Sequence, residues 1–347
     1  MDSLNLKTYF FYLATSIIII AGIKVASEIV VILFLSIFMA SIFSTLLKVL
    51  KKRAVPKMLA YFGVISIFVL FTILIGYIIN ISLKDFALNL PFYDEKFKIF
   101  IVDAINLFEK YGFVIDKATI LESLNFSSLF GFTTNIIGSI GTFLSKFLLI
   151  VIGIAFILAE TKSFETKLKV IFKYNVNKLK HFNLFSQNIQ KYFLVKSTTS
   201  FLTGFIIAVT LYFFGIDYPI LWGVLAMLFN FVPVVGSIIA AIPAVLISLL
   251  NADINTTIWL IVFYVTINIS ISNIIEPKLM GKELGLSPLV IFFSLIFWGW
   301  ILGIVGMFLA VPITMTLKIA FNSNSATYWI AILMSDLSSK RDKEIKG

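Results

Sequence analysis

The chain contains no cysteine, only one histidine and few charged residues, and each scarcity excludes a class of protein. Without cysteine there is no disulfide framework, no thiolate metal site and no cysteine nucleophile. His181 lies beside Lys180 in a basic stretch, so we interpret it as an ordinary interfacial residue rather than a metal ligand. The motifs of zinc proteases, serine hydrolases and phosphate-binding loops are also missing. We therefore expect neither an enzyme nor a bound cofactor or metal.

Apolar residues make up most of what is present. Hydrophobic residues account for 60% of the chain and charged residues for 13%, and the mean hydropathy is +1.03. Several apolar runs reach the ~20 residues that a helix needs to cross a bilayer. These features predict an all-α polytopic membrane protein. We attribute the net charge of +10 to lysine-rich cytoplasmic loops, where basic residues accumulate, and not to a surface that binds nucleic acid.

The order of apolar runs and basic loops predicts a topology with both termini in the cytoplasm. It divides the chain into residues 1–83 with three transmembrane helices, 84–141 as an extracytoplasmic helical segment, 142–160 as a fourth transmembrane helix, 161–196 as a cytoplasmic amphipathic segment, 197–322 as a transport unit, and 323–347 as a cytoplasmic tail. In the outer segment, apolar residues from Phe97 to Tyr111 repeat at helical spacing, which predicts packing against this chain or another subunit. The inner segment combines lysines with phenylalanines, as in helices that lie in the membrane interface.

The stretch from Asp217 to Phe321 contains one structural unit written twice. Pro219 and Pro243 have the same separation as Pro288 and Pro312, and a glycine-containing break lies between the members of each pair. The charges of the flanking loops place the entrance of the first hairpin outside and that of the second inside. This pattern predicts an inverted pair of broken-helix hairpins that meet near the membrane midplane. A chance match between apolar helices rich in glycine and proline is the alternative.

Polar side chains and helix breaks inside these spans are the candidate solute contacts, because unpaired polar groups are costly in hydrocarbon. The predicted solute-binding residues are Asn230, Pro233, Gly236, Asn268, Asn273, Trp298, Gly299 and Gly303. Asn268 and Asn273 belong to a polar stripe in the span 258–275, where hydrogen bonds between helices are the alternative. For Trp298 the alternative is an aromatic belt at the membrane surface.

No carboxylate falls at the predicted middle of a span, so the candidates for ion coupling come from span ends. Glu276 ends the polar stripe next to Pro277, and Asp217 precedes the first hairpin. Intramembrane acids of this kind mark ion pathways and proton relays, and we predict an ion-coupling role for both. An interfacial ion pair of Glu276 with Lys278 or Lys282 is the alternative.

Motifs of the C-terminal half resemble those of the autoinducer-2 exporter (AI-2E) family of bacterial permease-like proteins. They are NFVPVVG at 230–236, EPKLMG at 276–281, LSP at 286–288, WGWILGIVG at 298–306 and AVP at 310–312. The resemblance implies a multi-pass transporter of the bacterial plasma membrane that forms a homo-oligomer. Since the sequence has no nucleotide-binding domain, an ion or solute gradient must drive the transport.

The family includes proteins that resemble exporters of autoinducer-2, a small polyhydroxylated ring compound, and others that look like sodium(lithium)/proton antiporters. The expected partners are therefore the bilayer and either a small polar solute or a monovalent cation with protons. We expect export of a small polar solute first and cation/proton antiport second. A membrane scaffold without transport activity is the third alternative.

Overall fold

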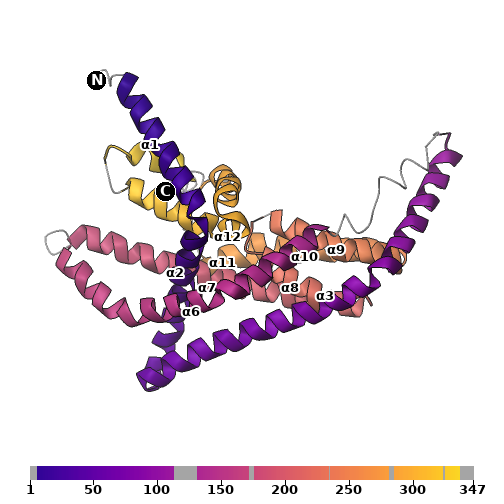
Figure 1. The fold of residues 1–347 in the computed structure, drawn as a ribbon, viewed down its shortest axis with the longest axis horizontal. Coiled ribbons are helices and arrows are strands. Elements are labelled where there is room, and N and C mark those ends of the chain that lie inside the picture. Colours follow the sequence, from indigo (N-terminus) through magenta and orange to yellow (C-terminus); the bar gives the residue numbers. More distant parts are fainter. Residues whose placement is uncertain are drawn as a thin grey trace, which may run out of the picture. The chain divides into compact units, whose positions relative to one another are not determined.

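The computed structural model describes residues 6–112, 131–171, 176–233, 235–280, 285–322 and 325–336, and these residues form helices joined by short turns (Figure 1). In chain order the elements are α1 (Leu6–Val25), α2 (Ser27–Lys52), α3 (Lys57–Lys110), α6 (Gly131–Ile171), α7 (Val176–Phe213), α8 (Pro219–Phe229), α9 (Val235–Asn251), α10 (Ile254–Ile269), η1 (Ser270–Ile275), α11 (Glu276–Met280), α12 (Pro288–Asn322) and α13 (Tyr328–Leu333). The predicted all-α class is confirmed over these residues.

Some predicted features lie outside the described residues. They include residues 113–130 of the outer segment, Lys282, and the tail beyond residue 336. The same is true of half of the side chains in the inner amphipathic segment 161–196, His181 among them. Expectations for these parts of the chain stay predictions.

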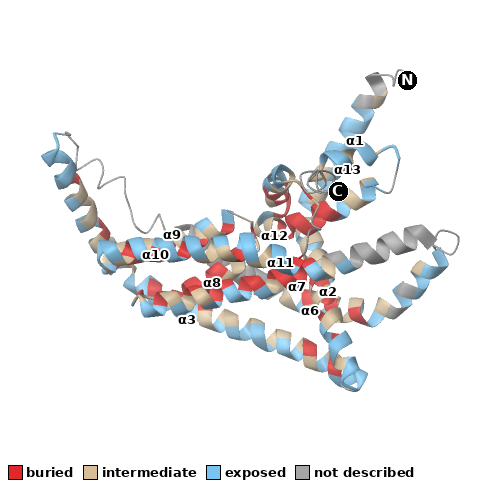
Figure 2. Cartoon of the chain, turned by 180° about the vertical axis from the view of Figure 1, so that it is seen from behind, coloured by how far each residue is buried: buried red, intermediate tan, exposed pale blue. Residues whose placement is uncertain are grey.

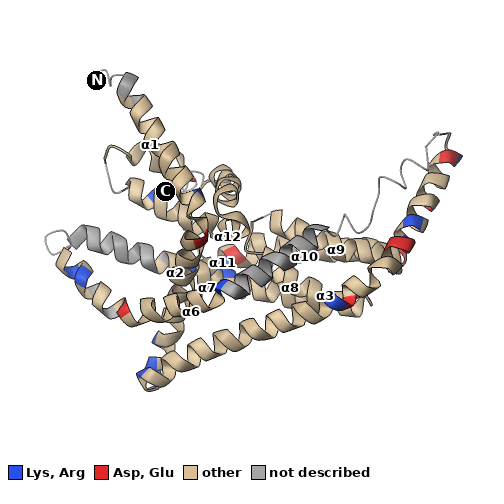
Figure 3. Cartoon of the chain, in the orientation of Figure 1, with Lys and Arg blue, Asp and Glu red and all other residues tan. Residues whose placement is uncertain are grey.

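Five helical stretches of the described chain are long and apolar enough to cross a membrane. They are Ser27–Lys52, Lys57–Lys110, Ile189–Phe213, Ile254–Met280 and Pro288–Asn322. Many large apolar side chains on these helices are exposed (Figure 2), as expected for surfaces in contact with lipid. The helices α8, α9 and α10 contain no charged residue (Figure 3). The multi-span membrane class is therefore confirmed.

The chain divides into two compact units. Unit 1 comprises Met1–Tyr61, Phe147–Val195 and Met280–Gly347, and unit 2 comprises Phe62–Lys146 and Lys196–Leu279. The first predicted hairpin and the span after it belong to unit 2, whereas the second hairpin belongs to unit 1. The meeting of the two hairpins inside the membrane therefore stays a prediction.

Two helices are longer than the sequence indicated. The third span and the start of the outer segment form one continuous helix, α3, which contains Pro91. The inner amphipathic segment and the fifth span likewise share α7. The apolar residues that repeat at helical spacing from Phe97 to Tyr111 pack in part within their own chain. Phe97 joins the core of unit 2, whereas Tyr111 is exposed.

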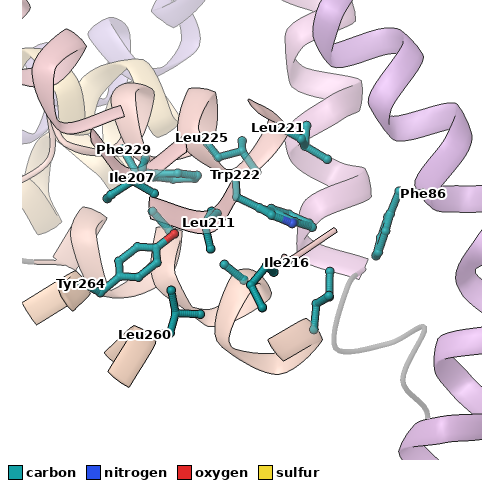
Figure 4. Close-up of a cluster of buried hydrophobic side chains, with 14 of the residues drawn as sticks. Phe86, Ile207, Leu211, Ile216, Leu221, Trp222, Leu225, Phe229, Leu260 and Tyr264 are labelled. Atoms are coloured by element: carbon teal, nitrogen blue, oxygen red, sulfur yellow. The ribbon is translucent and has the colours of Figure 1, made fainter. Parts of the chain in front are cut away.

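The core of unit 2 forms around Trp222 of α8, whose side chain is fully buried (Figure 4). The ring of Phe86 from α3 meets Trp222 edge to face, with ring centroids 5.6 Å apart. Side chains from α7, α9 and α10 complete the cluster, among them Leu211, Ala244 and Leu260. Close packing of these side chains holds α8 and α9 against the longer helices, because van der Waals contacts drive the association of helices in a membrane.

Both predicted hairpins contain a break at the expected place. In the first, the helix ends at Phe229 and resumes at Val235. In the second, α12 is interrupted at Gly303, whose φ of 68° and ψ of −153° are not helical. A positive φ is accessible to glycine at little cost because glycine has no Cβ. The breaks are thus observed in each hairpin by itself, and their inverted relation stays a prediction.

The end of the described chain is held against the start of the second hairpin within unit 1. The backbone N–H of Ser287 donates to the carbonyl of Met334 at 3.0 Å, and Leu286 forms an isolated antiparallel bridge with Ser335. Backbone hydrogen bonds therefore join the residues that precede α12 to those that follow the short helix α13.

Candidate functional site: a buried polar face in unit 2

One face of α7 contains a row of buried polar side chains. Lys196, Thr199, Ser200 and Thr203 recur at the spacing that places residues on one side of a helix, and none is more than 4% exposed. We call these four residues the α7 polar face. Polar groups at this depth must be paired, because an unpaired one costs several kcal/mol in hydrocarbon.

An ion pair joins the α7 polar face to the end of the sixth span. Lys196 Nζ donates to Glu276 Oε1 at 2.6 Å, and the side chains are 5% and 13% exposed, respectively. The hydroxyl of Thr199 donates to the same oxygen at 2.9 Å. Lys278, the partner that the sequence suggested, is exposed. Glu276 is therefore paired with Lys196 of α7, whereas Lys282, the other partner that the sequence suggested, lies outside the described residues.

A π-helical turn aims Glu276 at α7. On α10 the buried residues Leu260 and Tyr264 are one α-helical turn apart, and Ile271 continues the same face. The next residue of this face is Glu276, one position later than an α-helix would allow, because residues Ser270–Ile275 form a π turn. Such turns are rare and occur frequently at functional sites.

The break in the first hairpin is connected to the same polar face. Asn230 follows the last residue of α8, is 3% exposed, and donates its amide N–H to Ser200 Oγ at 3.0 Å. The two helices lie close together because Gly204 and Gly223 have no side chains. A Cβ added to Gly204 would lie only 2.5 Å from the carbonyl oxygen of Gly223. Small residues permit such contacts between membrane helices.

A buried tyrosine adds an unsatisfied hydroxyl to unit 2. Tyr264 is 3% exposed, and its hydroxyl has no hydrogen-bond partner among the described residues. Its ring belongs to the same cluster as Ile207, which follows Thr203 by one turn of α7 (Figure 4). A buried hydroxyl without a partner costs about 1–3 kcal/mol, so its presence calls for an explanation.

The other predicted residues of the first hairpin and sixth span differ in their surroundings. Pro233 lies half-buried in the turn, and its carbonyl accepts from the N–H of Val235 at 2.7 Å. Gly236 is buried against the end of α8. Asn268 is half-buried and donates to the carbonyl of Tyr264 at 2.9 Å. Asn273 is exposed in the π turn.

Asp217 belongs to a separate cluster at the far end of α7. Its carboxylate accepts from the hydroxyl of Tyr93 at 2.8 Å and from the amide of Asn251. The indole N–H of Trp222 donates to its backbone carbonyl at 2.9 Å. Since ~25 Å of helix separates Lys196 from the end of α7, the two predicted ion-coupling carboxylates are not brought together.

The predicted residues of the second hairpin lie in unit 1. Trp298 is 8% exposed, and its indole N–H donates to Thr314 Oγ1 at 3.1 Å, so it joins the two arms of α12. Gly299 faces Met307 across the hairpin, and Gly303 forms the kink between them. Trp298 therefore packs between the two arms of the hairpin, and its buried side chain differs from those of an aromatic belt at the membrane surface.

An open groove of about 590 Å³ lies along α12 in the same unit. Its walls are almost wholly apolar, with residues such as Leu289, Phe293 and Leu317. Such walls suit acyl chains better than a polar solute, because a polar group without a hydrogen-bond partner is costly there. The polar residues of unit 2 are therefore the better candidate site. Among the described residues no group of three or more histidines, aspartates and glutamates could hold a metal ion.

The site contains residues that the sequence interpretation missed. Thr199, Ser200 and Thr203 show the same helical spacing of polar residues that identified the sixth span, so a similar search would have found them. Lys196 was assigned to the inner basic segment because other lysines precede it. Tyr264 had no sequence signal, since a tyrosine in an apolar helix is ordinary and its unpaired hydroxyl depends on the packing.

Comparison with known proteins decides the family. The model of the AI-2E family transporters matches residues 13–325 of this chain. The chain belongs to the AI-2E family. Its similarity to other AI-2E-type proteins extends over nearly the full length, so the resemblance found in the C-terminal motifs is confirmed.

Three relatives illustrate this similarity. The chain is 36% identical to a putative transport protein of Haemophilus influenzae over 97% of this chain and 98% of that protein. It is 29% identical to the AI-2 transport protein TqsA of Escherichia coli over 93% of this chain and 94% of the relative. A putative transport protein of Borreliella burgdorferi is 28% identical over 98% of this chain and 96% of that protein. This AI-2E protein is therefore a multi-pass membrane transporter, and its relatives are named for transport rather than for an enzymatic reaction.

Proposed function

We propose that this AI-2E family transporter is a secondary transporter that exports a small polar solute such as autoinducer-2. The observation that supports this function best is the buried hydroxyl of Tyr264, which has no hydrogen-bond partner among the described residues and belongs to the same unit as the neutral hydroxyl groups of the α7 polar face. A polyhydroxylated solute exchanges hydrogen bonds readily with such groups, and no net charge has to enter the bilayer. The name of the relative TqsA, an AI-2 transport protein, points to the same class of solute.

The α7 polar face has the chemistry for this task. Thr199, Ser200 and Thr203 supply hydroxyl groups that both donate and accept, and Asn230 supplies an amide with both functions. Opening of the first hairpin would break the contact between Asn230 and Ser200 and offer both groups to a solute. Broken helices also free backbone groups at such positions in transporters.

The substitution Tyr264→Phe tests the solute role directly, because it removes only the hydroxyl. We expect at least a tenfold loss of export, while stability stays unchanged or rises by about 1–3 kcal/mol as the unpaired group is lost. Export is measured as extracellular autoinducer-2 in cells that lack the gene and carry each variant at matched membrane levels. Tyr77→Phe is the matched control, since Tyr77 is exposed on α3. Export at the wild-type rate by Tyr264→Phe would remove this hydroxyl from the site.

The predicted polar stripe supplies a second test of the same function. Alanine at Asn268 or Asn273 is expected to reduce export without affecting membrane insertion. Direct titration of the purified transporter in nanodiscs with autoinducer-2 then reports binding independently of export. Wild-type binding and export by both variants would exclude these two side chains from the solute site.

Sodium(lithium)/proton antiport is the second candidate, and the buried Lys196–Glu276 pair favours it. Charged residues within membrane spans commonly belong to ion pathways. In everted vesicles, addition of sodium should release protons, and Glu276→Gln should abolish this flux. Asp217→Asn tests the other predicted ion-coupling carboxylate in the same assay. Export that persists in Glu276→Gln while the sodium-dependent flux disappears would favour antiport as a separate activity.

The absence of cysteine makes the inverted topology easy to test. Single cysteines replace Asn255, which follows the first hairpin, and Lys278, which follows the sixth span; both positions are exposed. We expect an impermeant maleimide to label the first in intact cells and the second only in everted vesicles. Labelling of both from one side would contradict a sixth span that crosses the membrane and the inverted hairpins that depend on it.

A further inference from the structure

The ion pair between Lys196 and Glu276 is a costly way to join two helices in a membrane span. Both charges must leave water, and replacing a buried ion pair by uncharged side chains is often neutral or stabilising. Stability alone therefore does not explain why a lysine and a glutamate occupy these positions. The pair is also asymmetric, because Glu276 Oε1 accepts from Thr199 as well as from Lys196.

The π turn makes this contact depend on the backbone of the sixth span. If residues 270–275 were α-helical, Ile275 would take the place facing α7, since it follows Ile271 by one α-helical turn. Each residue of an α-helix turns the side chain by about 100°, so Glu276 would point away from Lys196 by roughly that angle. The carboxylate reaches the lysine only because the turn holds one additional residue.

We propose that Lys196 is an ion-coupling residue as well, and that it forms with Glu276 a charge pair that closes and opens during the transport cycle. This inference rests on the proposed transport function and adds a residue to it. When Glu276 takes up a proton from a hydronium ion on the aqueous side, an O–H bond of that ion breaks, an O–H bond forms on the carboxylate, and the carboxylate loses its charge. The ion pair then weakens to a hydrogen bond, and the attraction between α7 and the end of the sixth span decreases.

The surroundings of the pair contain few other charges. The helices α8, α9 and α10 contain none, and Lys278 on α11 is exposed. Among the described elements packed against Glu276, Lys196 is therefore the charged group that faces it, and the Thr199 hydroxyl is its neutral partner. Protonation of Glu276 changes the charge at this contact from balanced to positive, which is the change that a coupling site requires.

The test uses the full-length protein in proteoliposomes loaded with autoinducer-2 in one arm and with sodium ions in the other. Efflux is measured with and without an imposed pH gradient for the wild type, Lys196→Met, Glu276→Gln, the double variant and the control Lys278→Met. We expect the gradient-dependent rate to fall at least tenfold in each single variant and in the double variant. The control Lys278→Met is expected to keep the wild-type rate. The double variant is expected to unfold at the wild-type temperature, because no uncompensated charge remains.

The double variant separates coupling from folding. If it keeps the wild-type response to the pH gradient, the pair is only structural and the inference is overturned. Wild-type protein that moves neither autoinducer-2 nor sodium overturns the inference together with the proposed function. Gradient-dependent flux of sodium alone overturns the choice of solute, whereas loss of that flux in the variants supports the role of Lys196.

An exchange of neighbours tests the register set by the π turn. The variant Ile275→Glu with Glu276→Ile keeps the composition but moves the carboxylate by one position around the helix. We expect it to lose the gradient-dependent rate as fully as Glu276→Gln does. A wild-type rate in this variant would overturn the contact between Lys196 and Glu276 as the coupling element.

Discussion

The close contact at Gly236 gives the sharpest test of the hairpin geometry. A Cβ added to Gly236 would lie 1.9 Å from the carbonyl oxygen of Phe229, and real Cβ atoms essentially never come within 3.0 Å of such a group. The second hairpin has the same contact, since a Cβ on Gly306 would lie 2.0 Å from the carbonyl oxygen of Trp298. Alanine at either position must therefore push the two arms of its hairpin apart.

The magnitude follows from what has to move. The obstacle is a backbone carbonyl, so no side-chain rotation relieves the clash, and the second arm must shift by about 1 Å or more. Overpacking of this kind costs about 1–3 kcal/mol, and rigid surroundings favour the upper end of that range. The control is Gly63→Ala, because nothing lies within 4 Å of the added methyl group. In a helix interior that change stabilises by roughly 0.5–1 kcal/mol.

We expect Gly236→Ala and Gly306→Ala each to be about 2–4 kcal/mol less stable than Gly63→Ala. The free energy of unfolding is measured in detergent micelles by denaturant titration, with tryptophan fluorescence as the signal. Trp222 reports on unit 2 and Trp298 on the second hairpin, since both are buried. Equal unfolding midpoints for all three variants would refute the packing of arms against each other at these glycines.

Three further substitutions test contacts elsewhere in unit 1. Trp298→Phe removes the hydrogen bond to Thr314 and leaves the buried hydroxyl of Thr314 unpaired. We therefore expect the free energy of unfolding to fall by about 1–3 kcal/mol in the same titration; an unchanged midpoint would contradict this. Lys24→Met removes an ammonium group located 3.7 Å from the ring centre of Trp300, and a loss of about 0.5–1 kcal/mol is expected at this exposed site; a larger loss would mean that Lys24 has another role. Glu160→Gln breaks an ion pair exposed to solvent and should leave the thermal unfolding temperature unchanged; a measurable shift would show that the pair contributes to stability.

Much of the fold was readable because lipid imposes simple rules on a chain. Long apolar runs without charges have to become helices, since no other local structure satisfies the backbone in hydrocarbon. Glycine and proline at matching positions identified both breaks, and the structure has them near Pro233 and at Gly303. The lengths of α3 and α7 were harder to predict from the sequence, because a helix continues past the membrane boundary without a change in its hydrogen bonds.

The candidate site was predicted in part. Asn230 and Glu276 were both chosen from the sequence, and the structure connects each of them to the α7 polar face. The sequence suggested two nearby lysines as ion-pair partners of Glu276, whereas the observed partner, Lys196, comes from a distant part of the chain. Asp217 belongs to a different cluster, and Asn273 is exposed.

The sequence by itself determined the all-α membrane class, the family and the positions of the helix breaks. These properties depend on hydropathy, on glycine and proline, and on motifs that are local to short segments. Only the tertiary structure decided that Lys196 meets Glu276 and that the hydroxyl of Tyr264 has no partner among the described residues. Such facts depend on which helices pack together and on the one additional residue in the π turn, and neither leaves a local signal in the chain.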